Sequence, residues 1–492
     1  MIKKILIANR GEIAVRIIRT CKIMNILSVV IYSEIDKGSL HVQLADEAYC
    51  IGGPHAQNSY LDMEKILKIA IKSSSDAVHP GYGFLSENYK FAHLIEAHGL
   101  IFIGPRAQSI KQMGNKNKAR EIMINSKVPV IPGTKVLNSI ENAIEEASNL
   151  NFPLMMKASA GGGGRGINYI TSSNDIYKSF KKTQDEAFKA FGNKDIYFEE
   201  YISSSKHIEM QVLVDMYNNI MIFPERECSL QRNNQKIIEE SPSCFISKEI
   251  RIKLIETAMK AVKAVSYIGA GTIEFLMDKK NNFYFMEMNT RIQVEHPVTE
   301  MITDIDIIEL QIKIADKQSI KLYSNNYINY NGNAIEARIY AENLFNNKFI
   351  PSSGIINYLH LPGGPFIRID SGIHHNTNVT SYYDGLLVKV IAWGHNRNIA
   401  IKRLITALDE TNIVGCQTNI PFLIKVLKEQ NVQLGTYDTC SIDKMIEQKE
   451  QSNSNLCMIN TIIASSVKQI LIKLQINNNI NIGWQYSYYR KK

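Results

Sequence analysis

Five polar residues occupy alternate positions in the segment EMNTRIQVE: Glu287, Asn289, Arg291, Gln293 and Glu295. They directly follow the apolar run NFYFM, whose composition is typical of a strand. In an extended chain, alternate side chains point to the same side. The spacing therefore predicts that two carboxyl groups, two amides and a guanidinium face one place.

A second acid is expected opposite the first. The preceding run GTIEFLM is also strand-like, and a two-residue turn at Lys280 and Asn281 would place Glu274 directly across from Glu287. Opposed side chains have Cβ atoms about 5 Å apart, where two negative charges repel. Either one acid holds a proton or a divalent cation lies between them. With Asn289 nearby, oxygen-only ligands favour Mg²⁺ or Mn²⁺ over zinc; the alternative is an exposed hairpin whose acids are simply solvated.

The run KASAGGGGRG follows another strand-like segment. Its glycines, Gly161 to Gly164, can bring backbone N–H groups close to an anion, and Lys157 adds a positive charge. The run lacks the spacing G-x-x-x-x-G-K-[ST], so it does not predict a P-loop, and a flexible linker is the alternative. Because Mg²⁺ usually binds through a few carboxylates together with phosphates, the glycine run and the acids together predict ATP as ligand.

At this point several segments together resemble biotin carboxylase, an ATP-grasp enzyme: Lys116, KASAGGGGRG, FEEYI, ECSLQRNNQK, GAGTIEFL and EMNTRIQVEHPVTEMIT. The segments ANRGEIAVRIIR and HPGYGFLSEN resemble the N-terminal domain of that family, and AIEARIYAE and YYDGLLVK resemble its C-terminal domain. The resemblance extends from residue 1 to about residue 445. It implies a subunit of the biotin-dependent carboxylases of the acetyl-CoA, propionyl-CoA or methylcrotonyl-CoA type.

The resemblance also implies a reaction. ATP would activate bicarbonate as carboxyphosphate, and the carboxyl group would pass to N1′ of biotin held on a carrier protein. The cofactors expected on this basis are ATP and two Mg²⁺ or Mn²⁺ ions, with carrier-bound biotin as the substrate.

The same resemblance implies the roles of individual residues. The residues expected to contact ATP are Lys116, Lys157, Gly163, Gly164, His207, Gln231 and Asn234, with a hinge of Glu199, Glu200, Tyr201 and Ile202 that reads adenine through its backbone. The residues expected to hold the metals are Glu274, Glu287 and Asn289, and those expected to bind bicarbonate are Lys236, Arg291, Gln293 and Val294. Glu295 would take the bicarbonate proton, and Arg338 would stabilise the biotin enolate.

These residue types suit that chemistry. Bicarbonate is an anion that must attack an anionic phosphate, so cations such as Lys236 and Arg291 are needed to offset the repulsion. Arg338 is a permanent donor for the ureido oxygen of deprotonated biotin. Without the resemblance, Arg338 would be interpreted as a surface ion pair with Glu336 or Glu342.

The sequence departs from the family pattern at four positions. Asn233 and Asn234 stand where the family usually has Arg-His, Glu200 replaces a common Lys, and Gly385 replaces Ser. We expect weaker ATP binding with the chemistry intact, because Lys236 is retained. Two alternatives stay open: a catalytically weakened paralogue kept as an assembly subunit, and an ATP-grasp ligase for another acid.

The order of elements predicts an α/β protein in several domains. Strand-like and helix-like runs alternate through the first 112 residues, which favours a Rossmann-like parallel sheet. The expected domains are an N-terminal domain at 1–112, an ATP-grasp domain at 113–330 with a mobile lid at about 131–203, a C-terminal α+β domain with an antiparallel sheet at 331–446, and a polar tail at 447–492.

The composition limits the partners. Hydrophobic residues at 45% and charged residues at 21% are typical of a globular protein, and the net charge of +8 comes from scattered lysines, so neither nucleic acid nor membrane is an expected partner. Seven widely spaced cysteines without a C-x-x-C pair indicate reduced thiols and a cytoplasmic location.

The expected protein partners follow from the resemblance. The segment AMKA at 258–261 is similar to a biotin attachment motif, but Lys260 lies in a helical run, whereas carriers present their lysine on a hairpin. We therefore expect a separate biotin carboxyl carrier protein, a separate carboxyltransferase and a homodimer.

Overall fold

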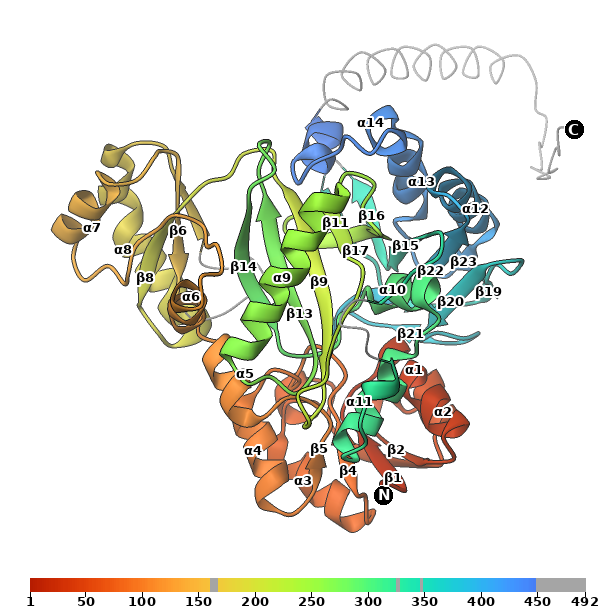
Figure 1. Cartoon of the computed structure of the whole chain (residues 1–492). Coiled ribbons are helices and arrows are strands. Elements are labelled where there is room, and N and C mark those ends of the chain that lie inside the picture. Colours follow the sequence, from red (N-terminus) through yellow and green to blue (C-terminus); the bar gives the residue numbers. More distant parts are fainter. Residues whose placement is uncertain (160–166, 324–327, 346–347, 448–492) are drawn as a thin grey trace, which may run out of the picture. The chain divides into compact units, whose positions relative to one another are not determined.

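The computed structural model describes residues 1–159, 167–323, 328–345 and 348–447. Its first part is a parallel sheet with the strand order β3-β2-β1-β4-β5 (Figure 1, red and orange). The strands are β1 (Lys4–Ile7), β2 (Leu27–Ser33), β3 (Glu47–Gly52), β4 (Ala77–His79) and β5 (Ile101–Phe102). The helices are α1 (Gly11–Ile23), α2 (Leu40–Leu44), α3 (Met63–Lys72), α4 (Tyr89–Ala97) and α5 (Ala107–Met113), with 3-10 turns at Glu34–Asp36 and Ala56–Asn58. The predicted parallel sheet is confirmed.

Both faces of this sheet are covered. Along β1, Ile5 and Ile7 belong to one buried apolar cluster, whereas Leu6 and the following Ala8 belong to another. Alternate side chains point to opposite faces, so each face has its own core. Burial on both faces explains why the strand sequences are almost continuously apolar.

A small antiparallel sheet with the order β7-β6-β8 forms the second part. Its strands are β6 (Leu154–Ala158), β7 (Ile167–Ile170) and β8 (Ile196–Glu200). Helix α8 (Ser173–Phe191) packs against all three strands, and α7 (Ile140–Ala147) packs on α8 and contributes to the same buried cluster. Helix α8 ends where Gly192 adopts a left-handed conformation with φ of 70°. The glycine run, including Gly163 and Gly164, lies outside the described residues.

The largest sheet has the order β14-β13-β9-β11-β12-β15-β22-β20, with β10 paired to β9. Its strands are β9 (Lys206–Val214), β10 (Ile220–Ile222), β11 (Arg226–Arg232), β12 (Gln235–Ser241), β13 (Gly269–Met277), β14 (Phe283–Asn289), β15 (Asn333–Tyr340), β20 (Ile367–Ser371) and β22 (Leu386–Gly394). Helix α9 (Lys248–Ala264) lies along β9 and β10 (Figure 1). The sheet does not stop at the expected boundary near residue 330, because β12 pairs with β15 from Ile238–Ala337 to Ser241–Ala334.

Further elements surround this sheet. The helices are α6 (Lys116–Asn125), α10 (His296–Thr303), α11 (Ile307–Ala315), α12 (Arg397–Glu410), α13 (Ile420–Lys428) and α14 (Gln430–Gln433), with a 3-10 turn at Lys321–Tyr323. Three two-stranded sheets are formed by β16 (Glu342–Phe345) with β17 (Lys348–Pro351), β18 (Gly354–Ile355) with β21 (Asn378–Val379), and β19 (Tyr358–His360) with β23 (Asn412–Val414). Helix α10 packs on β12, β15 and β22, and so covers the half of the large sheet that carries Arg338.

The hairpin between β13 and β14 differs from the expected turn. Lys279, Lys280 and Asn281 form a three-residue loop, closed by the backbone bond from Asp278 N to Asn282 O at 2.9 Å. The register is thereby shifted by one residue relative to the prediction. A β-bulge between Glu274 and Phe275 shifts it back, so the pairing beyond the bulge is the one that the sequence predicted.

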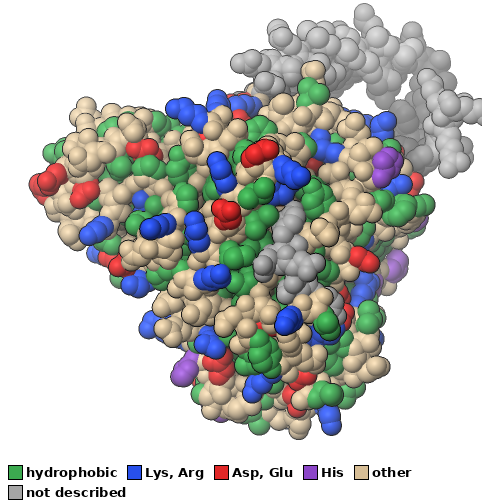
Figure 2. All heavy atoms as spheres, in the orientation of Figure 1, with side chains coloured by type: hydrophobic (Ala, Val, Ile, Leu, Met, Phe, Trp, Pro, Cys, Tyr) green, Lys and Arg blue, Asp and Glu red, His purple; other side chains and the backbone are tan. Residues whose placement is uncertain are grey.

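Two surface properties complete the description. Within the described ranges, no helix combines the length and apolar character needed to cross a bilayer. Lys and Arg side chains are dispersed among apolar and uncharged groups on the face that Figure 2 shows.

Candidate active site

Two acids stand opposite each other on β13 and β14. Glu274 and Glu287 are cross-strand partners, as the sequence predicted, and Asn289 lies two residues further along β14. Glu274 is buried, whereas the Glu287 side chain remains 32% exposed. The pair therefore has one acid within the protein and one that is open to solvent.

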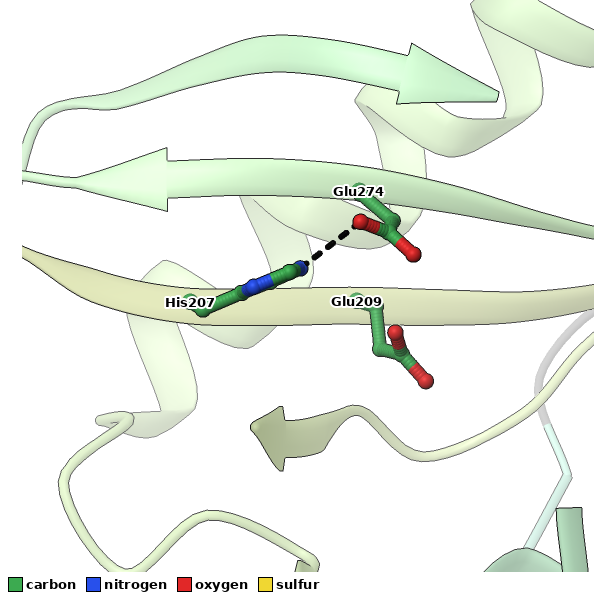
Figure 3. Close-up of side chains that lie close together, drawn as sticks. All are labelled: His207, Glu209 and Glu274. Carbon is green, nitrogen blue, oxygen red and sulfur yellow. Dashed lines mark ion pairs between the residues drawn. The ribbon is translucent and has the colours of Figure 1, made fainter. Parts of the chain in front are cut away.

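Nitrogen donors surround Glu274. Lys236 Nζ lies 3.0 Å from its carboxylate. His207 Nε2 lies 2.8 Å from the same carboxylate (Figure 3). The amides of Asn289 and Gln293 donate to it at 2.7 and 2.9 Å. Burial alone would raise the pKa of Glu274, but the charges of Lys236 and His207 outweigh it and hold the pKa well below its usual range. Glu274 is therefore a carboxylate and not the proton-holding member of an acid pair.

Lys116 holds the other acid. As the first residue of α6, it places its Nζ 3.4 Å from Glu287 Oε2, and its backbone N donates to Ser159 O just after β6. Helix α6 starts here because the Asn115 side chain caps it by accepting from Lys118 N. The cap thus fixes the position of the lysine that links the small sheet to the acids.

The segment after Asn289 is not an extended strand. Strand β14 ends at Asn289 and a turn leads into α10, so the predicted strict alternation does not continue to Glu295. The side chains nevertheless converge, because Arg291 donates through Nη1 to Gln293 Oε1 at 2.8 Å and through Nη2 to Asn289 Oδ1 at 3.1 Å. The prediction of convergence is confirmed, while the strand geometry offered for it is wrong.

Glu87 anchors this turn from the N-terminal part of the chain. Its carboxylate accepts from Arg291 Nε at 2.8 Å and from Thr290 N at 3.0 Å. Glu87 was not among the predicted site residues, although it belongs to HPGYGFLSEN. This segment leaves β4 at the carboxyl edge of the parallel sheet, where such sheets place ligands.

Lys236 joins three carboxylates. Its Nζ lies 2.6 Å from Glu209, 2.6 Å from Glu295 and 3.0 Å from Glu274. Burial alone would raise the pKa of Glu295, but Lys236 and then Arg338 outweigh it and lower the pKa well below the usual range. Glu295 occupies the N-cap position of α10, yet its side chain makes no capping bond. Its charge is therefore directed to the two cations, in the form that can accept a proton.

Glu209 is a member that sequence analysis missed. It projects from β9 beside His207, directly across from Glu274 on β13 (Figure 3). Fully buried, it is bonded to Arg226 Nε as well as to Lys236. The alternation of polar residues in HIEMQ was a signal for it, since 207 and 209 share one strand face.

Arg338 is buried, so its interpretation as a surface ion pair is wrong. Its Nη2 lies 2.8 Å from Glu295 Oε2 and 2.5 Å from Glu239 Oε1. Glu342, an alternative partner, is held by Arg232 at 2.8 Å.

The backbone of Val294 is held by a lysine of another strand. Its carbonyl oxygen accepts from Lys389 Nζ at 2.8 Å, and Lys389 is wholly buried on β22. A buried lysine therefore fixes the backbone of the residue that precedes Glu295.

The predicted adenine hinge lies on the small sheet. Lys157 on β6 places its Nζ 2.5 Å from Glu199 Oε2, and Glu199 and Glu200 end β8. The Glu200 side chain accepts from Asn151 N and Nδ2, each at 2.9 Å. Glu200 therefore binds a neighbouring loop, which gives the acid a local structural role. Tyr201 and Ile202 directly follow the strand, and Tyr201 N donates to Pro153 O at 2.9 Å.

A two-residue turn joins β11 and β12. Arg232 pairs with Gln235, and the residues between them, Asn233 and Asn234, have φ angles of 47° and 61°. Asparagine adopts this left-handed conformation more readily than most residues, and hairpin turns with two positive φ angles favour it. The local backbone thus accounts for the two asparagines at this departure from the family pattern. Gln231 lies next to the turn, directly across from Lys236.

The acid pair fits a hard divalent cation. Glu274, Glu287 and Asn289 offer carboxylate and amide oxygens, which Mg²⁺ and Mn²⁺ prefer. Three nitrogen groups, those of Lys116, His207 and Lys236, turn toward the two acids, which indicates a local excess of negative charge. For Asn289 to bind a metal through oxygen, its amide must present Oδ1 in place of the Nδ2 that now faces Glu274.

Comparison with protein families divides the chain into three consecutive matches. Residues 1–110 match the biotin carboxylase N-terminal domain, residues 115–323 match the carbamoyl-phosphate synthase L chain ATP-binding domain, and residues 336–444 match the biotin carboxylase C-terminal domain.

Individual proteins give the same result. The chain is 47% identical over 441 residues to biotin carboxylase 1 of Bacillus subtilis, covering 89% of this chain and 98% of the relative. It is 44% identical over 440 residues to the methylcrotonoyl-CoA carboxylase subunit alpha of Mus musculus, covering 89% of this chain and 61% of that one.

A solved structure agrees in fold. The biotin carboxylase domain dimer of Hydrogenobacter thermophilus 2-oxoglutarate carboxylase, in complex with MgADP, ADP and bicarbonate, matches with a TM-score of 0.87 and 43% identity, over 90% of this chain and 98% of the other. From residue 1 to residue 444, this chain belongs to the biotin carboxylase family.

Proposed function

We propose that the chain is an ATP-dependent ligase that carboxylates biotin. The observation that carries this proposal is the bonding of Glu295: one oxygen meets Lys236, which also meets Glu274, and the other meets Arg338. A proton acceptor thus lies between a candidate metal–nucleotide site and a candidate biotin site. The family relationship supports the same reaction.

Bicarbonate would bind against Lys236 and Arg291, with the Gln293 amide and the Val294 backbone completing the site. The two cations offset the repulsion between bicarbonate and the γ-phosphate of ATP. Glu295 takes the bicarbonate proton while a bicarbonate oxygen bonds to the γ-phosphorus. The bond from that phosphorus to the β–γ bridging oxygen breaks, which releases ADP and leaves carboxyphosphate.

Nucleotide and metal would be held by residues on both sheets. Glu274, Glu287 and Asn289 would hold Mg²⁺ or Mn²⁺, which supplies positive charge beside the phosphates. Lys116 and Lys157, now paired with Glu287 and Glu199, would turn to the phosphates. His207, Gln231 and Asn234 and the Glu199–Ile202 hinge would complete the site. Gly163 and Gly164 belong to the same proposal from sequence alone.

Biotin would bind beside Arg338. The guanidinium donates to the ureido oxygen, which carries negative charge once N1′ has lost its proton. The bond between the carboxyl carbon and the phosphate oxygen of carboxyphosphate breaks, and the released phosphate accepts the N1′ proton. N1′ then forms its bond to that carbon, and inorganic phosphate leaves.

The biotin would come from a separate carrier protein, and a separate carboxyltransferase would use the product. Lys260 supports this proposal, because it lies within α9 and not on a hairpin. A homodimer is proposed from the dimeric structure of the relative, and a cytoplasmic location from the cysteine pattern. The division into domains at 112, 330 and 446 remains a prediction.

The test is bicarbonate-dependent hydrolysis of ATP by the purified full chain at saturating MgATP. We expect hydrolysis that free biotin stimulates. If bicarbonate does not stimulate hydrolysis, the alternative of a catalytically weakened paralogue is favoured. The Asn233-Asn234 turn, which departs from the family pattern, is the observation that supports this alternative. If another acid stimulates hydrolysis of ATP and free biotin does not, an ATP-grasp ligase for that acid is favoured.

A further inference from the structure

A second pair of opposed acids lies on the large sheet. Glu239 on β12 and Glu336 on β15 are cross-strand partners, at 1% and 0% exposure. Their side chains therefore share a sheet face with Cβ atoms about 5 Å apart. Arg338 lies on the same face, two residues beyond Glu336.

The face is charged and enclosed. It is covered by α10, and α1 reaches its outer strands. Among the described residues, the titratable and charged groups that interact within this cluster are Glu12 and Arg16 from α1, Cys228 from β11, Lys236 from β12, Glu295, His296 and Glu300 from α10 and its cap, Arg338 and Tyr340 from β15, Arg368 and Asp370 from β20, and Lys389 from β22.

The other acids of this face have close cationic partners. Asp370 is bonded by Arg368 through two nitrogens, at 3.0 and 2.9 Å. Glu300 is bonded by the same arginine at 2.7 Å, and Glu12 lies 3.2 Å from Lys389. Each of these three acids therefore has a cation beside it, although burial still raises the pKa of Glu12 to about 7.

Glu239 and Glu336 differ. Among the described residues, neither carboxyl group has a hydrogen-bond partner, and Glu336 makes no ion pair. Glu239 lies near Arg338 Nη2, which it shares with Glu295. Within this part of the chain, Glu336 has no ion-pair partner, and the one cation bonded to Glu239 is also engaged by Glu295. The two buried carboxylates therefore leave a negative charge uncompensated, which protein interiors avoid by protonation.

The titration of the two groups agrees with this geometry. Burial raises the pKa of Glu239 to about 7, with a further rise from the negative charge of Glu295. Burial likewise raises the pKa of Glu336 well above its usual range. The charge of Lys389 opposes this rise without cancelling it, and the neighbouring Glu239 adds to it.

We propose that Glu239 and Glu336 share a proton and that this proton keeps Arg338 available to biotin. The inference rests on the function proposed above for Arg338. The two acids act as positioning residues, since they reach the substrate through the guanidinium.

The consequence is a dependence of biotin binding on pH. When Glu239 is neutral, Arg338 Nη2 is attracted by Glu295 alone and can donate to the ureido oxygen. When Glu239 ionises, it competes for Nη2 at the 2.5 Å contact. The apparent affinity for biotin is then proportional to the fraction of enzyme in which the pair is protonated, and it falls as that fraction falls with rising pH.

The test compares the same chemical change at the two positions. In the wild-type chain, the KM for free biotin should rise above about pH 7, by up to about tenfold per pH unit. Glu239→Gln removes the competitor, so its KM should stay flat over that range. Glu336→Gln removes the proton-sharing partner and so favours ionisation of Glu239, and its KM should begin to rise at a lower pH than in the wild type. A structural defect would not move the two variants in opposite directions.

Glu225→Gln is the matched control. Glu225 is a buried acid of the same chain, bonded by Arg251 at 2.7 and 2.8 Å, and it lies outside the proposed site. Its substitution should leave the pH profile of the biotin KM unchanged. A flat wild-type profile, or the same direction of change in Glu239→Gln and Glu336→Gln, would overturn the inference.

A readout without turnover separates this inference from the proposed function. Infrared spectra of the full chain near neutral pH should contain the C=O stretch of a buried protonated carboxyl group, altered by Glu239→Gln and by Glu336→Gln but not by Glu225→Gln. If ATP hydrolysis depends on bicarbonate and this band is absent, the inference fails alone. If the band is present and no bicarbonate-dependent hydrolysis occurs, the proposed function fails while the proton-sharing pair stands.

Discussion

Two pairs of opposed glutamates on one sheet lie in different electrostatic environments. Glu274 and Glu287, on β13 and β14, are surrounded by nitrogen donors, and the pKa of Glu274 is lowered. Glu239 and Glu336, on β12 and β15, are sealed from solvent, only Glu239 is bonded to a cation, and the pKa of each is raised by burial. The first pair suits a metal ion and the second suits a proton.

The difference teaches that an acid pair is not a site by itself. The local pattern is the same in both places: two carboxyl groups at directly paired positions. The number of nearby cations and the access of solvent decide whether such a pair binds a metal ion or a proton. Glu295 joins the two regions, because Lys236 connects it to the first pair and Arg338 to the second.

The largest effect is therefore expected at Glu295. Glu295→Gln removes the proton acceptor and keeps the shape, so kcat for bicarbonate-dependent ATP hydrolysis should fall about 100- to 10,000-fold. Steady-state assays at saturating ATP and bicarbonate measure it. Glu309→Gln on α11, in an i,i+4 ion pair with Lys313, is the control. Retention of activity within about threefold would exclude Glu295 as the base.

The metal pair is tested next. Glu287→Gln replaces a charged oxygen ligand, so the Mg²⁺ concentration at half-maximal activity should rise at least about tenfold. Titration of activity with Mg²⁺ at fixed ATP measures it. The same substitution at Glu239 should not shift the Mg²⁺ midpoint, and an equal shift in both variants would erase the distinction between the pairs.

Stability should respond to pH with opposite signs in the two regions. The pKa of Glu239 is raised from 4.5 to about 7 in the folded state, so its contribution is lost as pH rises across that window, by on the order of 1 to 3 kcal/mol. The pKa of Glu274 is lowered, so its contribution is present above the ordinary value of 4.5 and is lost as pH falls. Urea unfolding between about pH 5 and about pH 8 should give a shallower decline for Glu239→Gln than for the wild type. An unchanged slope would contradict the raised pKa.

The smallest effect is expected at Asn234, in the turn that is proposed to contact ATP. Asn234→His adds an imidazole donor at the turn, and histidine also tolerates positive φ, so the KM for ATP should fall about two- to tenfold. Asn234→Gly keeps the turn without a side chain and should raise the KM or leave it unchanged. If the histidine variant binds ATP no better than the glycine variant, position 234 does not contact the nucleotide.

Much of the fold could be predicted from sequence because its signals are local. The alternation of strand-like and helix-like runs predicted the parallel sheet. The continuation of the large sheet across residue 330 could not be predicted, because which strand edges pair depends on contacts between distant segments.

The register of the first acid pair was predicted correctly for an incomplete reason. The turn has one residue more than expected, and the bulge beside Glu274 cancels the shift, so Glu274 still lies across from Glu287. A local count cannot detect two irregularities that compensate.

The residues that sequence analysis missed come from other segments. Glu87 reaches Arg291 from 204 positions away, and Glu239 reaches Arg338 from a strand that becomes its neighbour only in the folded sheet. Motif reasoning finds residues that are close in the chain, whereas these positions need the topology.

The bond between Glu87 and Arg291 bears on how the molecule can be divided. A fragment limited to residues 113–330 would keep the acids of β13 and β14 but lose both Glu87 and Arg338. Such a piece could retain affinity for a nucleotide, yet Arg291, proposed to bind bicarbonate, would lose its bond to Glu87, and Arg338, proposed to contact biotin, would be missing. The residues proposed for the reaction thus lie in three segments of the chain, and none of these segments can be exchanged independently of the others.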